Sequence, residues 1–259
     1  MIAQERHKFI LDSLQDQHTV RAAKLASALG VSTETIRRDL EYLEKENQLI
    51  RVHGGASILQ YETRQVPYDF RLAAKVEEKR NLARTALGYV TEGTSIILDH
   101  SSTCCIFARE LKKHFSNLTI VTNSLEILNV FSDTPSYHII FLGGTFDTFE
   151  RGCFGESAKE TIRKLNIDMA FVSFGGISLN EGCTETFFAG AELLTEFIKA
   201  AQQKIALIDS SKFEHVTLVK VCNISDIDVI ITDSSIKPAV LHKYRAFVDI
   251  VYEENLIEK

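Results

Sequence analysis

Residues 19–56 read TVRAAKLASALGVSTETIRRDLEYLEKENQLIRVHGGA, and this stretch decides the fold of the N-terminal part of the chain. Small apolar residues recur there at the i, i+3, i+4 and i+7 positions of one helical face, namely Ala22, Leu25, Ala26 and Leu29. Gly30 tolerates the left-handed conformation that ends a helix, and Ser32 is a favourable N-cap for the next one. The pattern therefore predicts two helices joined by a tight turn.

The second of these helices buries Ile36, Leu40 and Leu43, while Glu34 and Asp39 place negative charge in its N-terminal half. After it, Leu49–Val52 and His53–Gly55 resemble a strand pair closed by a flexible tip. Two helices followed by such a wing are typical of a domain that reads the major groove of DNA. The residues expected to contact DNA are Lys24, Ser32, Thr33, Glu34, Thr35, Arg37, Arg38, Arg51, His53 and Gly54. Helical hairpins with a glycine turn also occur in proteins that never touch nucleic acid, which is the alternative interpretation.

Residues 3–56 resemble the winged helix-turn-helix of the DeoR family of bacterial transcriptional regulators. The family has a hydrophobic first helix, here ERHKFILDSL, and a recognition helix VSxxTIRRDLxxLE, here VSTETIRRDLEYLE. Its wing ends in RxHGGA, here RVHGGA. The resemblance implies that the second helix reads DNA, in agreement with the pattern of its residues.

The distribution of charge gives little support for general binding to polyanions. Residues 1–56 contain eight Lys plus Arg and eight Asp plus Glu, so their net charge is zero. Residues 57–259 contain 21 Lys plus Arg and 27 Asp plus Glu, which accounts for the net charge of −6. DNA binding must then depend on where the cations lie, with Lys24 and the arginines on one side and the acids of 41–46 on the distal part of the helix. We expect weak non-specific affinity.

The length of 259 residues and a hydrophobic content of 45% indicate two globular domains. We expect a DNA-binding domain over 1–56, a linker over 57–75 and an effector domain over 76–259. No apolar run approaches the ~20 residues needed to cross a membrane, and MIAQERHKF lacks the apolar core of a signal peptide. These features favour a cytoplasmic protein.

The five cysteines form no CxxC motif and no Cys/His pair at the spacing of zinc ligands, so no metal and no disulfide framework is expected. Most free cysteines are buried and reduced. A redox sensor made of Cys104 and Cys105 is the alternative.

Seven short apolar runs follow a helix expected over 76–90, and helical patterns separate most of them. Such runs are typical of a parallel sheet covered on both faces, so we predict a Rossmann-like, doubly wound α/β domain. The runs are 95–99, 118–122, 137–142, 169–174, 204–209, 228–232 and 247–251.

Polar and small residues follow five of these strands, at the sheet edge where α/β proteins bind ligands. Hydroxyls, helix N-terminal amides and Lys212 suit a phosphate group, and Asp99, Asn123 and Asp209 suit a polyol. The same residue types also cap helices and form turns, which is the alternative. The candidate effector residues are Asp99, His100, Ser101, Ser102, Thr103, Asn123, Ser124, Gly144, Arg151, Gly176, Asp209 and Lys212.

This half of the chain also resembles the effector domain of the DeoR family. That resemblance implies the fold of ribose-phosphate isomerase, binding of a sugar phosphate as inducer, and no cofactor. The landmarks here are LDHSST (98–103), TNS (122–124), LGG (142–144), GGIS (175–178), EGCTE (181–185) and DSSKF (209–213).

The chain departs from the family pattern in three places. Ser102 replaces the glycine of the first loop, Asp147 stands where an arginine is usual, and Gly190 and Leu194 replace the charged positions of the EAExK segment. Asp147 would repel an anion if it faced the pocket, and Arg151 is a candidate to supply the missing charge. The effector is therefore either an unusual sugar phosphate or a ligand of another class.

The preferred hypothesis is a repressor of a carbohydrate utilisation operon that a phosphorylated sugar releases from DNA. A phosphosugar isomerase-like enzyme using Asp99 or Asp209 as base is the main alternative, although an isomerase has no use for a winged helix. An activator with a non-phosphorylated effector and a purely structural DNA binder are the others. One recognition helix cannot specify a site alone, so a homo-oligomer is expected.

Overall fold

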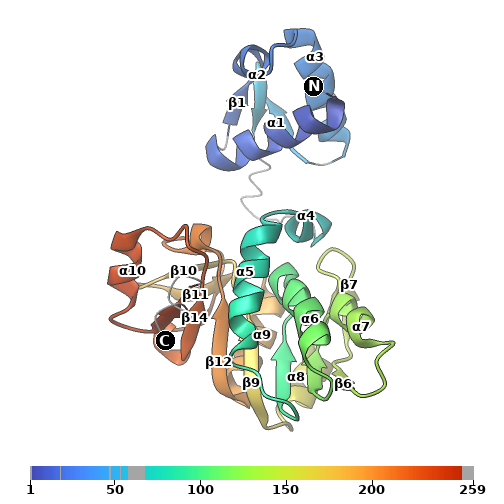
Figure 1. Ribbon diagram of the computed structural model, residues 1–259, viewed down its shortest axis with the longest axis vertical. Helices are drawn as coiled ribbons and strands as arrows, with labels where there is room; N and C mark the ends of the chain where they lie inside the picture. Colours follow the sequence, from blue (N-terminus) through green and yellow to red (C-terminus); the bar gives the residue numbers. More distant parts are fainter. Residues whose placement is uncertain (1, 18, 47, 53, 58–67, 253–259) are drawn as a thin grey trace. The chain divides into compact units, whose positions relative to one another are not determined.

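The computed structural model describes residues 2–17, 19–46, 48–52, 54–57 and 68–252. The chain divides into two compact units, Met1–Val66 and Pro67–Lys259. Each is described here by itself (Figure 1). Among the described residues, no helix combines the length and the apolar character that a membrane span requires.

The described residues of the N-terminal unit form three helices and a small antiparallel sheet. The helices are α1 (Ala3–Gln17), α2 (Ala22–Leu29) and α3 (Thr33–Lys45), and the strands are β1 (Thr19–Arg21), β2 (Ile50–Val52) and β3 (Gly55–Ser57). The strands pair in the order β1-β3-β2. The sequence pattern predicted α2, α3 and the wing, but it did not predict β1, whose three residues are too few to show a periodicity of their own.

The predicted helix faces form the core of this unit. Leu25 and Leu29 of α2 pack with Ile36, Leu40 and Leu43 of α3 in one buried cluster. Gly30 ends α2 with φ 63°, and the Ser32 hydroxyl accepts a hydrogen bond from the Thr35 amide at 3.1 Å. The helix-turn-helix thus forms for the reasons that its sequence indicates.

The C-terminal unit is built on a seven-stranded, fully parallel sheet, which confirms the predicted α/β class. Each of its strands lies within or overlaps one of the seven apolar runs. They are β4 (Ser95–Leu98), β5 (Thr119–Thr122), β6 (His138–Phe141), β9 (Ile167–Val172), β12 (Ala201–Leu207), β14 (Val229–Ile231) and β15 (Asp249–Val251).

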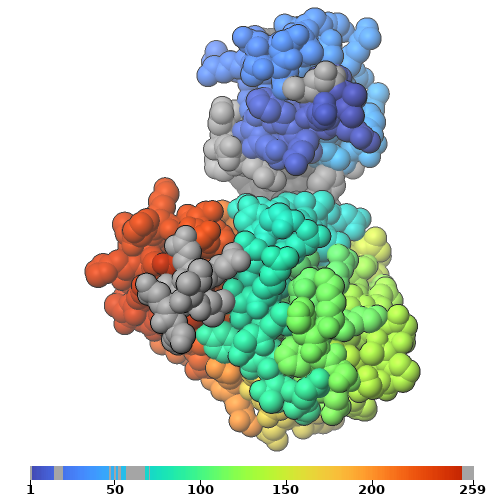
Figure 2. Space-filling model, in the orientation of Figure 1, coloured from blue at the N-terminus to red at the C-terminus, as the bar shows by residue number. Residues whose placement is uncertain are grey.

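Helices cover both faces of this sheet (Figure 1). One buried cluster joins the sheet to α5 (Val76–Leu87), α6 (Ser102–His114) and α7 (Leu125–Phe131), and includes Leu82, Phe107 and Phe131. The other joins it to α8 (Glu156–Ile162), α9 (Phe188–Ala200) and α10 (Pro238–Tyr244). The outer surfaces of α5 and α6, teal and green in Figure 2, form much of the visible face of the unit.

The strand order β15-β14-β12-β9-β4-β5-β6 places a topological switch point between β4 and β9. From β4 the chain passes outward through β5 and β6, and it then returns to β9 on the other side of β4. In open α/β sheets, ligands bind outside the carboxyl ends of the strands at such a point.

Two small antiparallel sheets, which the sequence analysis treated as loops, flank that edge. The first is a hairpin of β7 (Thr145–Asp147) and β8 (Gly152–Phe154). The second contains β10 (Gly176–Ser178), β11 (Gly182–Glu185) and β13 (Val219–Cys222). Their strands have three or four residues each, too short for alternation to be recognised in the sequence.

A helix, α4 (Tyr68–Ala73), lies in the range that the sequence analysis interpreted as linker. Its Tyr68 is buried in the same cluster as Leu82 and Phe107. Six residues preceded by a proline show little helical periodicity, so only the tertiary contact reveals that α4 belongs to the packed unit.

Candidate DNA-binding surface and effector site

The N-terminal half of α3 exposes the side chains that were predicted to enter the major groove. Arg37 and Arg38 have side chains 65% and 79% exposed, and each lies 3.8 Å from a carboxylate oxygen of Glu34. These contacts are long and exposed, so they hold the guanidinium groups weakly. Both arginines are therefore free to exchange Glu34 for a phosphate or a base edge.

Asp39 of the same helix does not face solvent. Its carboxylate is buried and accepts hydrogen bonds from Arg6 Nε at 2.7 Å and Arg6 Nη2 at 2.9 Å, and it lies 3.1 Å from His7 Nε2. Burial alone would raise the pKa of Asp39, but the contacts with Arg6 and His7 hold it below its usual range. The expectation that Asp39 supplies charge to the helix N-terminus is replaced by a structural role, since it fixes α3 to α1.

The wing places Arg51 on β2, with its side chain 43% exposed and 3.9 Å from Glu44. Gly54 is exposed in the turn between β2 and β3 at φ 80°, which favours glycine. His53 lies outside the described residues. Of the other predicted DNA contacts, Lys24, Ser32, Thr33 and Glu34 are exposed and Thr35 is partly buried.

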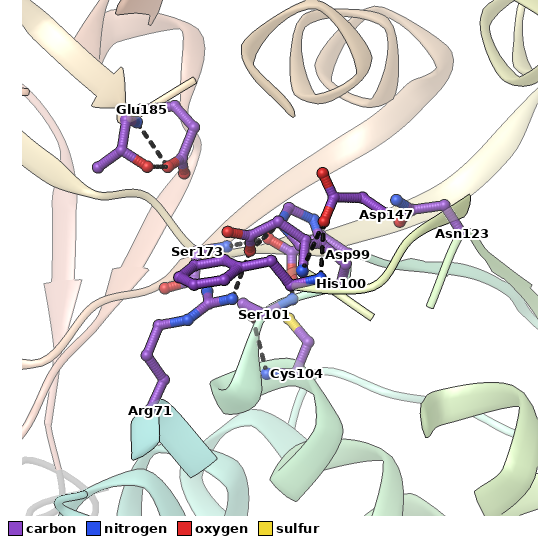
Figure 3. A network of polar contacts seen from close by, with 12 residues as sticks. Arg71, Asp99, His100, Ser101, Cys104, Asn123, Asp147, Ser173 and Glu185 are labelled. Carbon is purple, nitrogen blue, oxygen red and sulfur yellow. Dashed lines mark hydrogen bonds and ion pairs between the residues drawn. The ribbon is translucent and has the colours of Figure 1, made fainter. Parts of the chain in front are cut away.

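At the carboxyl edge of the large sheet, Asp99 connects the loops that follow β4 and β9. Its side chain is fully buried, and its two oxygens accept hydrogen bonds from the Ser101 amide at 2.8 Å and the Ser173 amide at 2.7 Å. Figure 3 shows Asp99, Ser101 and Ser173 converging at this point. Asp99 thus ties the loop after β4 to the loop after β9.

The loop after β4 leads directly into α6. Ser101 is its N-cap and accepts a hydrogen bond from the Cys104 amide at 3.1 Å. Ser102 and Thr103 form the first turn and are buried. Because amides point outward from a helix N-terminus, this end of α6 attracts an anion.

The loop after β5 supplies Asn123 and Ser124, both fully buried. Asn123 Nδ2 donates to the Cys153 carbonyl at 3.0 Å, which ties this loop to β8, and Ser124 caps α7. Among the described residues, Asn123 Oδ1 has no hydrogen-bond partner. It is an acceptor available to a ligand hydroxyl.

Gly144 and Gly176 lie at the edge of the site for reasons of packing. A Cβ on Gly144, whose φ is 133°, would lie 2.3 Å from the Phe154 carbonyl oxygen. A Cβ on Gly176 would lie 2.4 Å from the His215 carbonyl oxygen. Both glycines therefore allow backbones to approach each other, which accounts for them without a ligand.

After β12, Asp209 and Lys212 lie together with a lysine that the sequence analysis did not select. Asp209 accepts a hydrogen bond from Lys75 Nζ at 2.8 Å, and Lys212 Nζ donates to the Phe174 carbonyl at 2.6 Å. Burial opposes ionisation of Asp209, yet the charges of Lys212 and Lys75 outweigh it and lower the pKa of Asp209 to about 2. Asp209 is thus a carboxylate that neutralises two cations.

Arg71 and Glu150 were not among the site residues predicted from the sequence. Glu150 Oε2 forms an ion pair with Arg71 Nη2 and lies 3.4 Å from His100 Nε2, and the Glu150 side chain is only 1% exposed. Figure 3 shows Arg71 reaching toward His100 and Asp99. Arg71 comes from α4, and no local motif marks either residue, so only a tertiary contact identifies this buried pair.

The structure shows the contacts that Asp147 and Arg151 make. Asp147 is exposed and accepts hydrogen bonds from the amides of Phe149 at 2.8 Å and Glu150 at 3.0 Å, so it shapes the β7–β8 turn. Arg151 lies 3.8 Å from Asp69 of α4. The guanidinium in the buried network is that of Arg71.

Cys104 and Cys105 are fully buried, and Cys104 Sγ donates to the Phe171 carbonyl at 3.3 Å. Burial raises the pKa of both thiols. Because thiolates are the reactive form, the redox alternative loses its support. Among the described residues, no three His, Cys, Asp or Glu side chains are arranged to hold a metal ion.

Comparison with protein families accounts for both units. Residues 6–62 match the DeoR-like helix-turn-helix domain, and residues 74–234 match the DeoR C-terminal sensor domain. The chain therefore belongs to the DeoR family of transcriptional regulators. The family assigns DNA binding to the first unit and sensing of a small molecule to the second.

Curated relatives match over nearly their full length. The HTH-type transcriptional regulator GolR of Listeria innocua is 31% identical and covers 93% of this chain and 94% of its own. The HTH-type transcriptional repressor GlcR of Bacillus subtilis is 32% identical, and the match covers 90% of this chain and 89% of GlcR. The L-fucose operon activator of Escherichia coli is 31% identical, and the match covers 88% of this chain and 94% of the activator.

Among solved structures, a D-ribose-5-phosphate isomerase in complex with phospho-erythronic acid resembles this chain with a TM-score of 0.40 and 18% identity. The match covers 53% of this chain and 54% of the isomerase.

Proposed function

We propose that this protein is a DNA-binding repressor of a carbohydrate utilisation operon, and that a phosphorylated sugar releases it from its operator. The observation that carries the proposal is the set of groups at the carboxyl edge of the large sheet. The N-terminus of α6 and Lys212 offer positive potential at this edge, while Asn123 Oδ1 offers an acceptor. Phosphate oxygens and sugar hydroxyls together require this combination of groups.

A titration with inducer tests the proposal. If Lys212 binds the phosphate, Lys212→Ala removes a charge-assisted hydrogen bond and raises the inducer concentration needed for release by roughly ten- to hundredfold. The variant should still bind its operator, because Lys212 belongs to the sensor unit. A panel of phosphosugars is titrated against a preformed complex of protein and operator, with Lys243→Ala as the control because Lys243 is exposed and pairs only with Glu214 among the described residues. An unchanged inducer response in Lys212→Ala would contradict the phosphate assignment.

The proposal also holds that the protein is not an enzyme. Asp99, the base considered for an isomerase, already accepts two backbone amide hydrogen bonds, and Asp209 neutralises lysines. Neither carboxylate is poised to remove a proton from carbon. We expect the purified protein to bind a phosphosugar without converting it. Isomerisation that disappears in Asp99→Asn would overturn this part of the proposal.

The second candidate function is that of an activator of transcription in place of a repressor, because one relative is named an activator. A reporter driven by the bound promoter separates the two. Deletion of the gene should raise expression from this promoter if the protein is a repressor and lower it if the protein is an activator.

We also propose that the protein binds its operator as a homo-oligomer, since one recognition helix gives too little affinity alone. Sedimentation of the complex with operator DNA gives the number of chains bound.

A further inference from the structure

Two ion pairs join α4 to consecutive residues of the turn between β7 and β8. Arg71 contacts Glu150, and Asp69 lies 3.8 Å from Arg151. The second pair is exposed and contributes little. The first is buried on the Glu150 side, where a lone carboxylate would be costly. Of the two ion pairs between α4 and this turn, the Arg71–Glu150 pair is therefore the stronger.

This buried pair is incompletely satisfied. Within the part of the chain that the structure describes, Glu150 Oε1 and Arg71 Nε have no hydrogen-bond partner, and neither does Asn123 Oδ1. Glu150 and Asn123 are 1% and 0% exposed. Buried polar atoms without partners are rare because each costs free energy. The open donor of Arg71 suits an anionic group and the open acceptor of Asn123 suits a hydroxyl, so the two indicate a ligand that carries both.

A second cation reaches the site from the junction of α4 and α5. Lys75 has φ 51°, a left-handed conformation that is unfavourable for a side chain other than glycine. Its Nζ donates to Asp209 at 2.8 Å and to Ser211 Oγ at 2.5 Å. Non-glycine residues in this conformation persist where surrounding contacts enforce them, frequently at ligand sites.

The junction itself is held by Lys79 of α5. The buried Lys79 ammonium donates to the Arg71 carbonyl and, at 2.8 Å, to the Ala74 carbonyl. Its desolvation, reinforced by the positive charge of Lys212, lowers the pKa of Lys79 to about 8. Four cations thus gather here, Arg71, Lys75, Lys79 and Lys212, and the carboxylates in direct contact with them are Glu150 and Asp209. The surplus positive charge is what a phosphate dianion would neutralise.

We propose that Arg71 and Lys75 bind the anionic group of the effector, and that Glu150 and Asp209 are internal counter-ions which this group replaces. The inference rests on the proposed function and adds to it. Without ligand each of these two cations is held by a carboxylate, and with ligand it is held by phosphate, while Glu150 Oε2 keeps its neighbour His100 Nε2 at 3.4 Å. Because α4 is the first described element after residues 58–67, occupancy of the pocket acts on the helix nearest in sequence to the DNA-binding unit.

The exchange predicts opposite effects for the two partners of one ion pair. Arg71→Gln removes a phosphate ligand and should weaken binding of a phosphosugar roughly ten- to hundredfold. Glu150→Gln removes the competing carboxylate and should tighten binding, by roughly three- to tenfold, because the ligand no longer displaces a charged partner. A purely structural ion pair predicts that both variants weaken binding alike.

The test is isothermal titration of the full chain with inorganic phosphate and with phosphorylated sugars and polyols of three to six carbons, each beside its unphosphorylated form. Arg80→Gln and Glu77→Gln are the matched controls, since these residues form an exposed ion pair on α5. Both controls should titrate like the wild type. The unphosphorylated forms should show no difference between Arg71→Gln and the wild type.

The outcomes separate the two proposals. If the wild type binds no phosphorylated probe, the proposed function fails and the inference fails with it. If the wild type binds one and the two substitutions do not shift its affinity in opposite directions, only the inference is overturned. If Arg71→Gln does not fold, Arg71→Lys replaces it, and an affinity equal to that of the wild type counts against the inference. Hydrogen exchange over residues 68–73 gives a second readout, in which Glu150→Gln should exchange faster than the wild type and inorganic phosphate should restore protection.

Discussion

The arginines of α3 and the arginine of α4 present the same guanidinium group in opposite settings. Arg38 is 79% exposed on its side chain and lies 3.8 Å from Glu34, whereas Arg71 contacts a carboxylate that is 1% exposed. DNA binds to the outer surface of a protein, so the cations that contact it can remain exposed to solvent in the free protein at little cost in free energy. A buried ligand site cannot keep unpaired charge when empty, and it must carry its own counter-ions. The difference predicts that DNA displaces only a weak, exposed contact with Glu34 at α3, whereas the effector, as proposed above, replaces a buried partner at α4.

The largest expected effect is that of removing Asp99, the carboxylate that joins the loops after β4 and β9. Asp99→Ala leaves two buried amides without their charged acceptor and should destabilise the sensor unit by about 3 kcal/mol or more. Asp147→Ala is the matched control, because Asp147 also accepts two amides but is exposed, and its loss should cost much less. The chain contains no tryptophan, so chemical unfolding is followed by far-UV circular dichroism. Equal losses in the two variants would show that burial of the carboxylate does not matter.

Next in size is the contribution of α3 to operator binding. Arg38→Ala should weaken binding by about 1 to 3 kcal/mol if the guanidinium contacts a base, or lower the salt slope by about one if it contacts phosphate. Lys45→Ala, on the exposed distal end of the same helix, should have little effect. Binding is measured by fluorescence anisotropy at several salt concentrations. Unchanged affinity in both Arg37→Ala and Arg38→Ala would refute the assignment of α3 to the groove.

The smallest effect concerns the counter-ion Asp209, whose pKa is lowered from 3.8 to about 2. A carboxyl group with a lowered pKa in the folded state stabilises the protein fully above pH 3.8, and this contribution is lost as the pH falls through 2. The loss amounts to about 2 kcal/mol. Unfolding of the sensor unit at pH 2 to 5 should therefore show an acid-dependent loss that Asp209→Asn reduces by about that amount. The same acid dependence in Asp209→Asn would mean that Asp209 is not held by Lys75 and Lys212.

Local patterns in the sequence determined much of this protein. The apolar face of α2, the glycine turn, the Ser32 cap and the exposed arginines of α3 all follow from side-chain spacing along a single helix. The strands of the large sheet follow from unbroken apolar runs, since strands buried on both faces have no polar side. The loops at the carboxyl edge could be predicted from the same apolar runs, because all strands of a parallel sheet end on the same side.

Only the tertiary structure decided how these loops are completed. It added the β7–β8 hairpin, the sheet of β10, β11 and β13, and the helix α4 within the expected linker. It turned Asp39 inward toward Arg6, and it joined Arg71 to Glu150 across 79 residues of sequence. A buried ion pair has no periodicity and no local signature, because each partner is stabilised by a group that the chain brings back from far away. The sequence therefore determines which edge of the sheet is polar, and the fold decides which charges meet there.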